Sequence, residues 1–307
     1  MTISPADIDA AEARIRPHIR LTPVLDVTPN LQFKLEFLQH GGSFKPRGAY
    51  NTLLSQTIPK AGVAAASGGN HGLAVALAAR TVGVRATIFV PDIASPAKIA
   101  GIRAAGADIR IGGARYNDAL AACTAFIAES GALSVHAFDA DDTLAGQGTV
   151  AREWDWQCGA PLDTVLVAVG GGGLIAGMAA WWQGRVKVVG VEPEGSCALH
   201  AAITAGETVD VEVNSVAADS LGARRVGERV YAIARQHVAR VVLVPDAAIV
   251  AAQQEAWSQF RIAAEPGGAT ALAALRSGAY VPTAGERVGV LMCGSNVELT
   301  KLAGVVA

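Results

Sequence analysis

Short apolar segments alternate with amphipathic segments along most of this chain of 307 residues. From Val63 onward the apolar runs have the length of strands, and the segments between them repeat their apolar residues with helical spacing. The expected strands are Val63–Ala66, Arg85–Val90, Asp108–Gly112, Leu133–His136, Thr164–Val169, Val186–Glu192, Val238–Val244 and Val288–Cys293. The expected helices include His71–Thr81, Pro96–Ala105, Tyr116–Glu129, Thr143–Gln157 and Ala247–Phe260.

This alternation predicts an α/β protein whose sheets are parallel and built from right-handed βαβ units. The strands are apolar nearly throughout, as is typical when helices cover both faces of a sheet. A closed (β/α)₈ barrel also satisfies the alternation, whereas the glycine-rich turns favour open sheets that bind ligands at the carboxyl ends of their strands. The sequence contains no repeat and no composition that would mark a linker.

Composition excludes several classes of partner. The net charge is −2 and only 5% of residues are aromatic, so neither a basic face nor a set of stacking side chains is available for nucleic acid or an acidic membrane. The four cysteines, Cys123, Cys158, Cys197 and Cys293, lack metal-ligand spacing. A reducing cytoplasm is therefore expected, with no disulfide framework.

The segment from Val165 to Trp182 is uncharged and long enough to cross a bilayer. Four successive glycines at its centre would break a helix and leave backbone groups unpaired in lipid. We therefore interpret this segment as a buried strand, a turn and a helix, and expect no membrane association.

Lys45 lies in the segment GGSFKPRGAYN, residues 41–51. Ser43 could cap a helix and Pro46 is tolerated in its first turn, which places Lys45 at a helix N-terminus. The positive end of the helix dipole should lower the pKa of this amine, as an amine that forms a Schiff base requires. Lys34 and Lys60 lack this context and are expected to tolerate alanine.

A second segment, residues 64–79, reads as strand, tight turn and helix. The turn residues Ser67, Gly68 and Gly69 would expose backbone N–H groups at the start of the helix, which is typical of an anion site. Asn70 and His71 follow directly. A capped helix with a satisfied histidine is the alternative, and the Gly-Gly-Asn run favours a ligand only slightly.

A third segment leads from a buried strand into Gly170, Gly171, Gly172 and Gly173 and then into a helix. Backbone without Cβ atoms lets a phosphate approach the amides closely. The same residues satisfy a dinucleotide fingerprint, because Ala176 completes Gly-x-Gly-x-x-Ala and Glu192 ends the next strand. On this segment alone a nicotinamide-dependent oxidoreductase is equally favoured, although it would leave Lys45 without a role.

The fourth segment, residues 288–300, ends a buried strand at Cys293 and continues with Gly294, Ser295 and Asn296. Small polar residues at the carboxyl end of a strand suit a ligand site. Taken alone, a buried cysteine that packs as a small apolar residue explains this segment better.

The order SFKPRGA, SGGNHG, VGGGGL and CGSN resembles the serine/threonine dehydratase group of fold-type II pyridoxal phosphate (PLP) enzymes, which includes threonine deaminase and serine racemase. The resemblance covers a catalytic domain from about Leu21 to the C-terminus, with further matches at KLEFLQ, AGQGT, VEPEGS and AEPGGATALAAL. It implies two open, twisted, mostly parallel sheets with flanking helices, as in the tryptophan synthase β fold. It also implies a large PLP-binding domain of residues 1–54 and 141–307 and a small domain of residues 55–140.

The resemblance also assigns roles at the site. Lys45 would be the Schiff-base lysine, and Phe44 would lie beside the cofactor ring. Asn70 would bind the phenolic oxygen, Gly170–Gly173 the phosphate, and Cys293 would face the pyridine nitrogen. The substrate carboxylate would bind at Ser67, Gly68, Gly69 and His71.

Several relatives bind a divalent cation beside the phosphate loop, and Glu192 and Ser196 match two of its ligands. Because Ala198 occupies the position of the second acidic ligand, no metal is expected and dependence on a cation should be weak. A homo-oligomer, a dimer or a tetramer, is expected.

The implied reaction converts L-threonine or L-serine to a 2-oxo acid and ammonia by β-elimination. Hydroxyaspartate dehydration, serine racemisation and a non-catalytic PLP-binding protein remain alternatives. Racemisation should be minor, because serine racemases carry a serine where this chain has Gly68. The cofactor is expected to be pyridoxal 5′-phosphate and the partner a small β-hydroxy amino acid.

Overall fold

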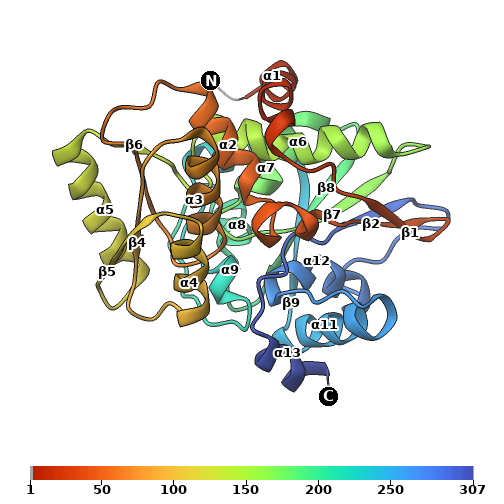
Figure 1. Cartoon of the computed structure of the whole chain (residues 1–307). Helices are drawn as coiled ribbons and strands as arrows, with labels where there is room; N and C mark the ends of the chain where they lie inside the picture. Colours follow the sequence, from red (N-terminus) through yellow and green to blue (C-terminus); the bar gives the residue numbers. More distant parts are fainter. Residues whose placement is uncertain (1–2, 307) are drawn as a thin grey trace.

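The computed structural model describes residues 3–306, which form two open sheets (Figure 1). The larger sheet has the strand order β1-β2-β10-β7-β8-β9. Its strands are β1 (Val24–Thr28), β2 (Leu31–Lys34), β10 (Val288–Leu291), β7 (Thr164–Ala168), β8 (Lys187–Pro193) and β9 (Val238–Val244). All neighbours are parallel except the β1–β2 hairpin.

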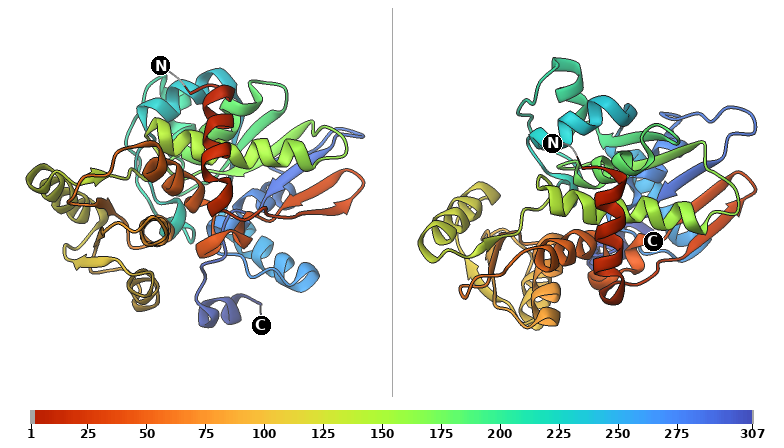
Figure 2. Two further views of the ribbon diagram at one scale, coloured as in Figure 1. Left: turned by 45° about the horizontal axis from the view of Figure 1, so that its top comes forward. Right: turned by 90° about the horizontal axis from the view of Figure 1, so that it is seen from above.

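The smaller sheet has the order β5-β4-β3-β6 and is parallel throughout. Its strands are β5 (Asp108–Ile111), β4 (Ala86–Val90), β3 (Val63–Ala66) and β6 (Leu133–Ser134). The two sheets lie side by side and stay separate in both further views (Figure 2).

The predicted fold class is confirmed, and the two open sheets exclude the closed barrel. Each predicted strand is present, and the predicted ends differ by up to two residues. The β1–β2 hairpin was not predicted. Its strands are short and contain polar residues, and β2 becomes buried only because it pairs with the distant β10.

Helices cover both faces of each sheet, as the apolar strands require. Helices α6 and α7 lie on one face of the larger sheet and α11 and α12 on the other, while α3 and α4 lie opposite α5 on the smaller sheet (Figure 1). The helices are α1 (Pro5–Ile15), α2 (Lys45–Ser55), α3 (Asn70–Val82), α4 (Pro96–Ala104), α5 (Tyr116–Ser130), α6 (Asp141–Gln157), α7 (Gly173–Trp182), α8 (Ala198–Ala205), α9 (Ala218–Leu221), α10 (Glu228–His237), α11 (Asp246–Phe260), α12 (Pro266–Ser277) and α13 (Leu299–Val306). Short 3₁₀ turns span Arg16–His18, Glu36–Leu38 and His40–Gly42.

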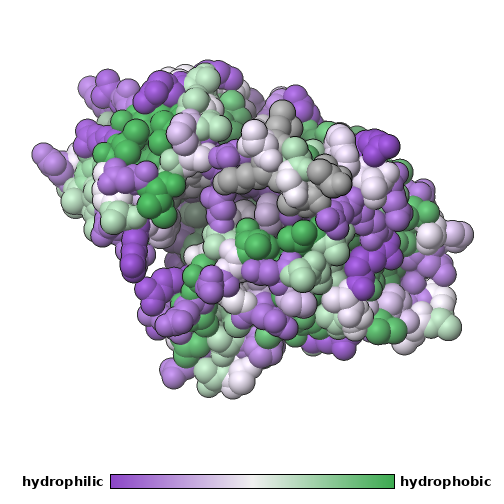
Figure 3. All heavy atoms as spheres, turned by 90° about the horizontal axis from the view of Figure 1, so that it is seen from below, coloured by the Kyte–Doolittle hydropathy of each residue, from purple (hydrophilic) through white to green (hydrophobic). Residues whose placement is uncertain are grey.

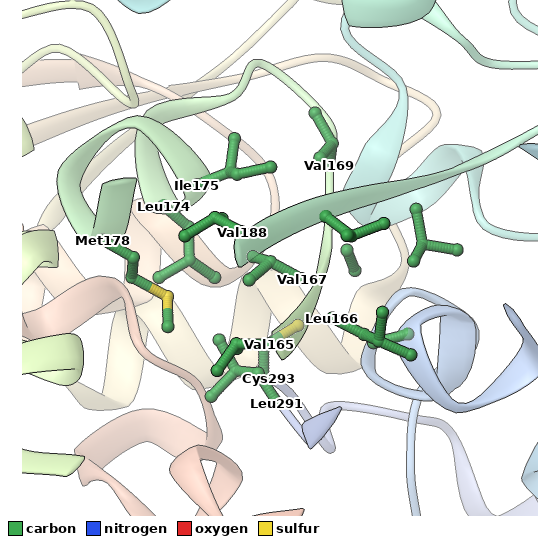
Figure 4. Packing of buried hydrophobic residues seen from close by; sticks show 14 of the residues in the cluster. Val165, Leu166, Val167, Val169, Leu174, Ile175, Met178, Val188, Leu291 and Cys293 are labelled. Carbon is green, nitrogen blue, oxygen red and sulfur yellow. The ribbon is translucent and has the colours of Figure 1, made fainter. Parts of the chain in front are cut away.

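The core of the larger sheet is almost entirely aliphatic. Val165, Leu166 and Val167 of β7 are fully buried and meet Ile175 and Met178 of α7 (Figure 4). Burial of each such side chain contributes about 1.5–3 kcal/mol, so this strand and helix are held mainly by packing. The rigid centre of the sheet therefore fixes the loop between β7 and α7.

Helix α2 packs against α3 on one side and α6 on the other, so it lies between the two sheets. It begins at Lys45, as predicted, but Phe44 is its N-cap residue and no side chain caps it. The prediction that Ser43 caps this helix is wrong, because Ser43 is held instead in an extended bridge to Gly294.

Within residues 3–306, no helix combines the length and the apolar composition needed to cross a membrane. The uncharged segment from Val165 to Trp182 consists of β7, a glycine turn and α7, as its glycines predicted. The assignment of residues 55–140 to a separate small domain stays a prediction.

Candidate active site

The third and fourth sequence segments meet at the edge of the larger sheet that is formed by the carboxyl ends of its parallel strands. Strands β7 and β10 are parallel neighbours, so Gly170–Gly173 and Cys293 follow the carboxyl ends of adjacent strands. The first segment joins them, because the Phe44 amide donates to the Cys293 carbonyl at 3.2 Å. Parallel strands commonly bind ligands at this edge.

The Lys45 amine faces this edge from the first turn of α2. Its Nζ donates to the Ala137 carbonyl at 2.8 Å and lies 5.0 Å from the centre of the Phe44 ring. Burial lowers the pKa of Lys45 to about 8, although Cys293 and Glu265 act in the opposite direction. About a tenth of this amine is therefore uncharged at pH 7, far more than for an ordinary lysine, and can act as a nucleophile or a base.

The Gly170–Gly173 turn has a geometry that side chains could not adopt. Gly172 has a φ of +83°, which favours glycine, and a Cβ on Gly171 would lie 2.3 Å from the Phe138 ring. The turn leads directly into α7 at Gly173, so its amides lie at the positive end of a helix. This is a suitable cradle for the phosphate of a cofactor.

Ser43 supplies a second indication of a ligand. Its hydroxyl is buried and has no hydrogen-bond partner among the described residues. Buried polar atoms are rarely left unpaired in a native protein, and an orphan beside Lys45 and Cys293 fits a site that holds a polar group. The residues present therefore fit pyridoxal phosphate.

The second segment forms the tight turn that its glycines predicted. Ser67 follows β3, and its hydroxyl accepts from the Gly69 amide at 3.2 Å, while α3 begins at Asn70. A Cβ on Gly68 would lie 2.7 Å from the Cβ of Ala94, so the chain after β4 closes over this position.

The His71 ring has a hydrogen-bond partner outside the turn. Its Nε2 contacts the Val135 carbonyl at 2.8 Å. Burial and the nearby Lys45 lower the pKa of His71 to about 3, so the ring is neutral at physiological pH. Any contribution of His71 to anion binding would come from its backbone amide, since the ring is already engaged.

Cys293 is buried, and its thiol lies 3.6 Å from the Gly267 carbonyl. Burial and the nearby Glu265 raise the pKa of this thiol to about 12. It therefore stays protonated at neutral pH.

Glu265 is a site residue that the sequence analysis missed. It precedes α12 and is 4% exposed, and its Oε1 accepts from Asn70 Nδ2 at 2.6 Å. Its segment, AEPGGATALAAL, carried the family resemblance but gave no local reason to assign the carboxylate a role. The contact joins residues 195 positions apart, which a local pattern cannot reveal.

The Glu192 carboxylate is engaged by the backbone of a neighbouring helix. This carboxylate is buried and accepts from the amides of Leu199 and His200 at 2.9 and 2.8 Å, so it caps the start of α8. In a dinucleotide site the matching acid would bind a ribose. Because Glu192 is engaged by the backbone, the oxidoreductase alternative lacks the acidic residue of its fingerprint. Among residues 3–306 no group of three or more His, Cys, Asp or Glu side chains could hold a metal ion. Weak cation dependence at Glu192 and Ser196 stays a prediction.

An ion pair joins the two sides of the site. Lys98 of α4 pairs with Asp219 of α9, which connects a helix of the smaller sheet to a segment that contacts Gly170 and Gly267. The two sheets are thus linked by charge as well as by α2.

Comparison with known proteins agrees with this geometry. Residues 15–294 match the family described as pyridoxal-phosphate dependent enzyme. A phenylserine dehydratase of Ralstonia pickettii is 38% identical, over 96% of this chain and 94% of its own length. A catabolic L-threonine dehydratase of Staphylococcus aureus is 33% identical, over 99% and 92%. The structure of maize serine racemase superposes with a TM-score of 0.92 at 31% identity, over 99% and 97%.

These matches exclude the two alternatives, a nicotinamide oxidoreductase and a non-catalytic binding protein. They establish pyridoxal phosphate as the cofactor. The chain belongs to the family of pyridoxal-phosphate dependent enzymes and, within it, to the fold-type II serine/threonine dehydratase group.

Proposed function

We propose that this enzyme removes water and ammonia from a small β-hydroxy amino acid, with Lys45 as its cofactor-binding and catalytic lysine. The observation that carries this proposal is the meeting of Lys45, the Gly170–Gly173 turn and Cys293 at one sheet edge. L-Threonine and L-serine are the simplest substrates of this class. The relative named phenylserine dehydratase adds aryl β-hydroxy amino acids.

The residues would divide the work of holding the cofactor. The Gly170–Gly173 amides would bind its phosphate, Asn70 its phenolic oxygen, and Phe44 would lie beside its ring. Cys293 would face the pyridine nitrogen, and a protonated thiol cannot keep that nitrogen charged as a carboxylate would. Bound pyridoxal phosphate supplies an electron sink that makes the Cα proton of an amino acid acidic.

The substrate would be held at the start of α3. The backbone amides of Gly68, Gly69 and His71 lie at the positive end of that helix, which favours a carboxylate. Ser67 would contribute its hydroxyl, because its amide already donates to the Phe89 carbonyl at 2.9 Å. Lys45, with its lowered pKa, would take the Cα proton as general base. The Cα proton and the β-hydroxyl thus leave together as one water, and addition of one water to the freed enamine yields a 2-oxo acid and ammonia.

A substrate panel tests this proposal. Purified holoenzyme would be incubated with L-threonine, L-serine, L-phenylserine and 3-hydroxyaspartate, and both 2-oxo acid and ammonia would be measured. Equal amounts of the two products from at least one substrate support the proposal. Turnover of none of the four would refute it.

A homo-oligomer, dimer or tetramer, is also proposed. Several large apolar side chains are exposed, among them Trp156 at 71% and Val281 at 72%. On the face seen from below, hydrophobic and hydrophilic residues are interspersed (Figure 3). Light scattering on the purified enzyme tests the assembly, and a mass equal to one chain would contradict it.

A further inference from the structure

The side-chain amide of Asn70 is held at both ends. Its Nδ2 donates to Glu265 Oε1 at 2.6 Å, and its Oδ1 accepts from Asn296 Nδ2 at 2.8 Å. Asn296 in turn donates to the Gly41 carbonyl at 2.7 Å. These contacts leave one orientation for the amide. Since Nδ2 carries two hydrogens, one remains for a ligand.

Glu265 is itself fixed by close packing. Its amide donates to the Gly294 carbonyl at 3.2 Å, and a Cβ on Gly294 would lie 2.0 Å from Glu265 Oε1. The carboxylate thus occupies the space that a side chain at position 294 would need. Gly294 directly follows Cys293, so the carboxylate lies within the cofactor site.

A purely structural role explains Glu265 poorly. It precedes α12 yet its side chain makes no capping hydrogen bond to that helix. Among the described residues, Asn70 is the one side chain that donates to it. Burial raises the pKa of Glu265 to about 7, although Asn70 and Lys98 lower it. A buried carboxylate is costly, and an apolar residue would serve packing better.

We propose that Glu265 is a positioning residue, which holds the Asn70 amide so that its free N–H faces the phenolic oxygen of the cofactor. This inference rests on the proposed role of Asn70 at that oxygen. Asn296 fixes the opposite end of the amide, so Glu265 and Asn296 together prevent its rotation. Neither residue needs to touch the cofactor.

A double-mutant cycle on the purified holoenzyme tests the inference. The Kd of pyridoxal phosphate and its absorbance maximum would be measured for Asn70→Ala, Glu265→Ala, Glu265→Gln and the double alanine variant. Asn70→Ala and Glu265→Ala should each weaken binding about tenfold, because each removes a hydrogen bond that involves a charged partner or the ligand. The double variant should bind no more weakly than Asn70→Ala, because the two changes act through one amide.

Glu265→Gln is the conservative variant, since its carbonyl can still accept from Asn70. It should restore the Kd to within about threefold of the wild type and keep the absorbance maximum, as expected when the hydrogen bond rather than the charge positions Asn70. Glu286→Gln is a matched control, because Glu286 is also a buried carboxylate but contacts Thr164 and Thr283 at a distant edge. It should leave the Kd unchanged.

The outcomes separate two failures. If Asn70→Ala binds the cofactor like the wild type, the role proposed for Asn70 is wrong and this inference fails with it. If Asn70→Ala weakens binding but Glu265→Ala does not, or if the two effects simply multiply, only the inference about Glu265 is overturned.

Discussion

Two basic residues in the first turn of α2 meet opposite environments. Arg47 is fully buried, donates to Glu36 at 2.5 and 3.0 Å and to Glu153 at 2.9 Å, and these carboxylates raise its pKa against the effect of burial. Lys45 has no carboxylate within ion-pair distance among the described residues, and burial lowers its pKa to about 8. The same helix thus carries one cation that is held by ion pairs and one amine that none of the described carboxylates pairs with.

Lys34 belongs to the same buried charge cluster, which we define as Lys34, Glu36, Arg47 and Glu153. Its Nζ donates to Glu153 at 2.5 Å and to the Thr22 carbonyl at 2.7 Å, and the side chain is fully buried. Lys34 therefore has a structural role, contrary to the expectation from its sequence context. The cluster links β2, α2 and α6.

The largest effect is expected at Lys45. Lys45→Ala should abolish the cofactor absorbance and reduce elimination by roughly a thousandfold or more, because it removes both the nucleophile and the general base. Compared in the cofactor-free state, the variant and the wild type should have nearly the same melting temperature, since no ion pair is lost. Activity and absorbance of the purified variant test this. Retained turnover would refute the assignment.

In the charge cluster, substitutions are expected to lower the stability of the fold. Arg47→Met should destabilise the fold by roughly 3–5 kcal/mol, because it leaves the buried Glu36 carboxylate without a cation. Lys34→Ala should destabilise it by less, because Glu153 keeps its ion pair with Arg47 at 2.9 Å. Urea unfolding measures the loss. Lys60→Ala is the control, since Lys60 is exposed and should stay within about 0.5 kcal/mol of the wild type. Equal stability of all three variants would show that the cluster contributes nothing.

The two regions should also differ in pH dependence. Burial would raise the pKa of Glu153, but Arg47 and Lys34 lower it overall, so its stabilisation is present above the ordinary glutamate value and is lost as the pH falls. Glu265 behaves in the opposite way, because burial raises its pKa to about 7. The folded state then binds the extra proton, and its stability declines as the pH rises from about 4.5 to 7, by at most about 1.4 kcal/mol per pH unit.

Unfolding of the cofactor-free enzyme from pH 4.5 to 8 measures this decline. Glu265→Gln cannot titrate at this position, so its free energy of unfolding should lack this decline. The free energy of unfolding of the wild type minus that of the variant should therefore fall as the pH rises. A difference that does not vary with pH would show that Glu265 does not titrate in this range.

A smaller effect concerns racemisation, which needs an acid or base on each face of the cofactor. In the proposed mechanism Lys45 would provide a base on one face, whereas Gly68 on the turn has neither a side chain nor room for one beside Ala94. With L-serine as substrate, D-serine should therefore remain below about a tenth of the pyruvate formed, since proton return from the second face needs a donor. Comparable amounts of D-serine and pyruvate would show that another group supplies the proton.

Local patterns predicted the strands, the glycine turns and the start of a helix at Lys45, because each depends on residues adjacent in the sequence. Three features were beyond such reasoning. Lys34 pairs with Glu153 across 119 positions, and Glu265 meets Asn70 across 195. The expected cap at Ser43 failed because Ser43 pairs with Gly294, near the other end of the chain. Buried polar residues find their partners only in the folded protein, so the fold was more predictable than the contacts that set the electrostatics of the site.

The central claim is that Lys45 carries the cofactor. Borohydride reduction of the holoenzyme would fix pyridoxal phosphate to its lysine, and peptide mass mapping would identify the residue. We expect the added mass on the peptide that contains Lys45 and loss of the absorbance band. Attachment at Lys34, Lys60 or Lys98, or at no lysine, would contradict the account.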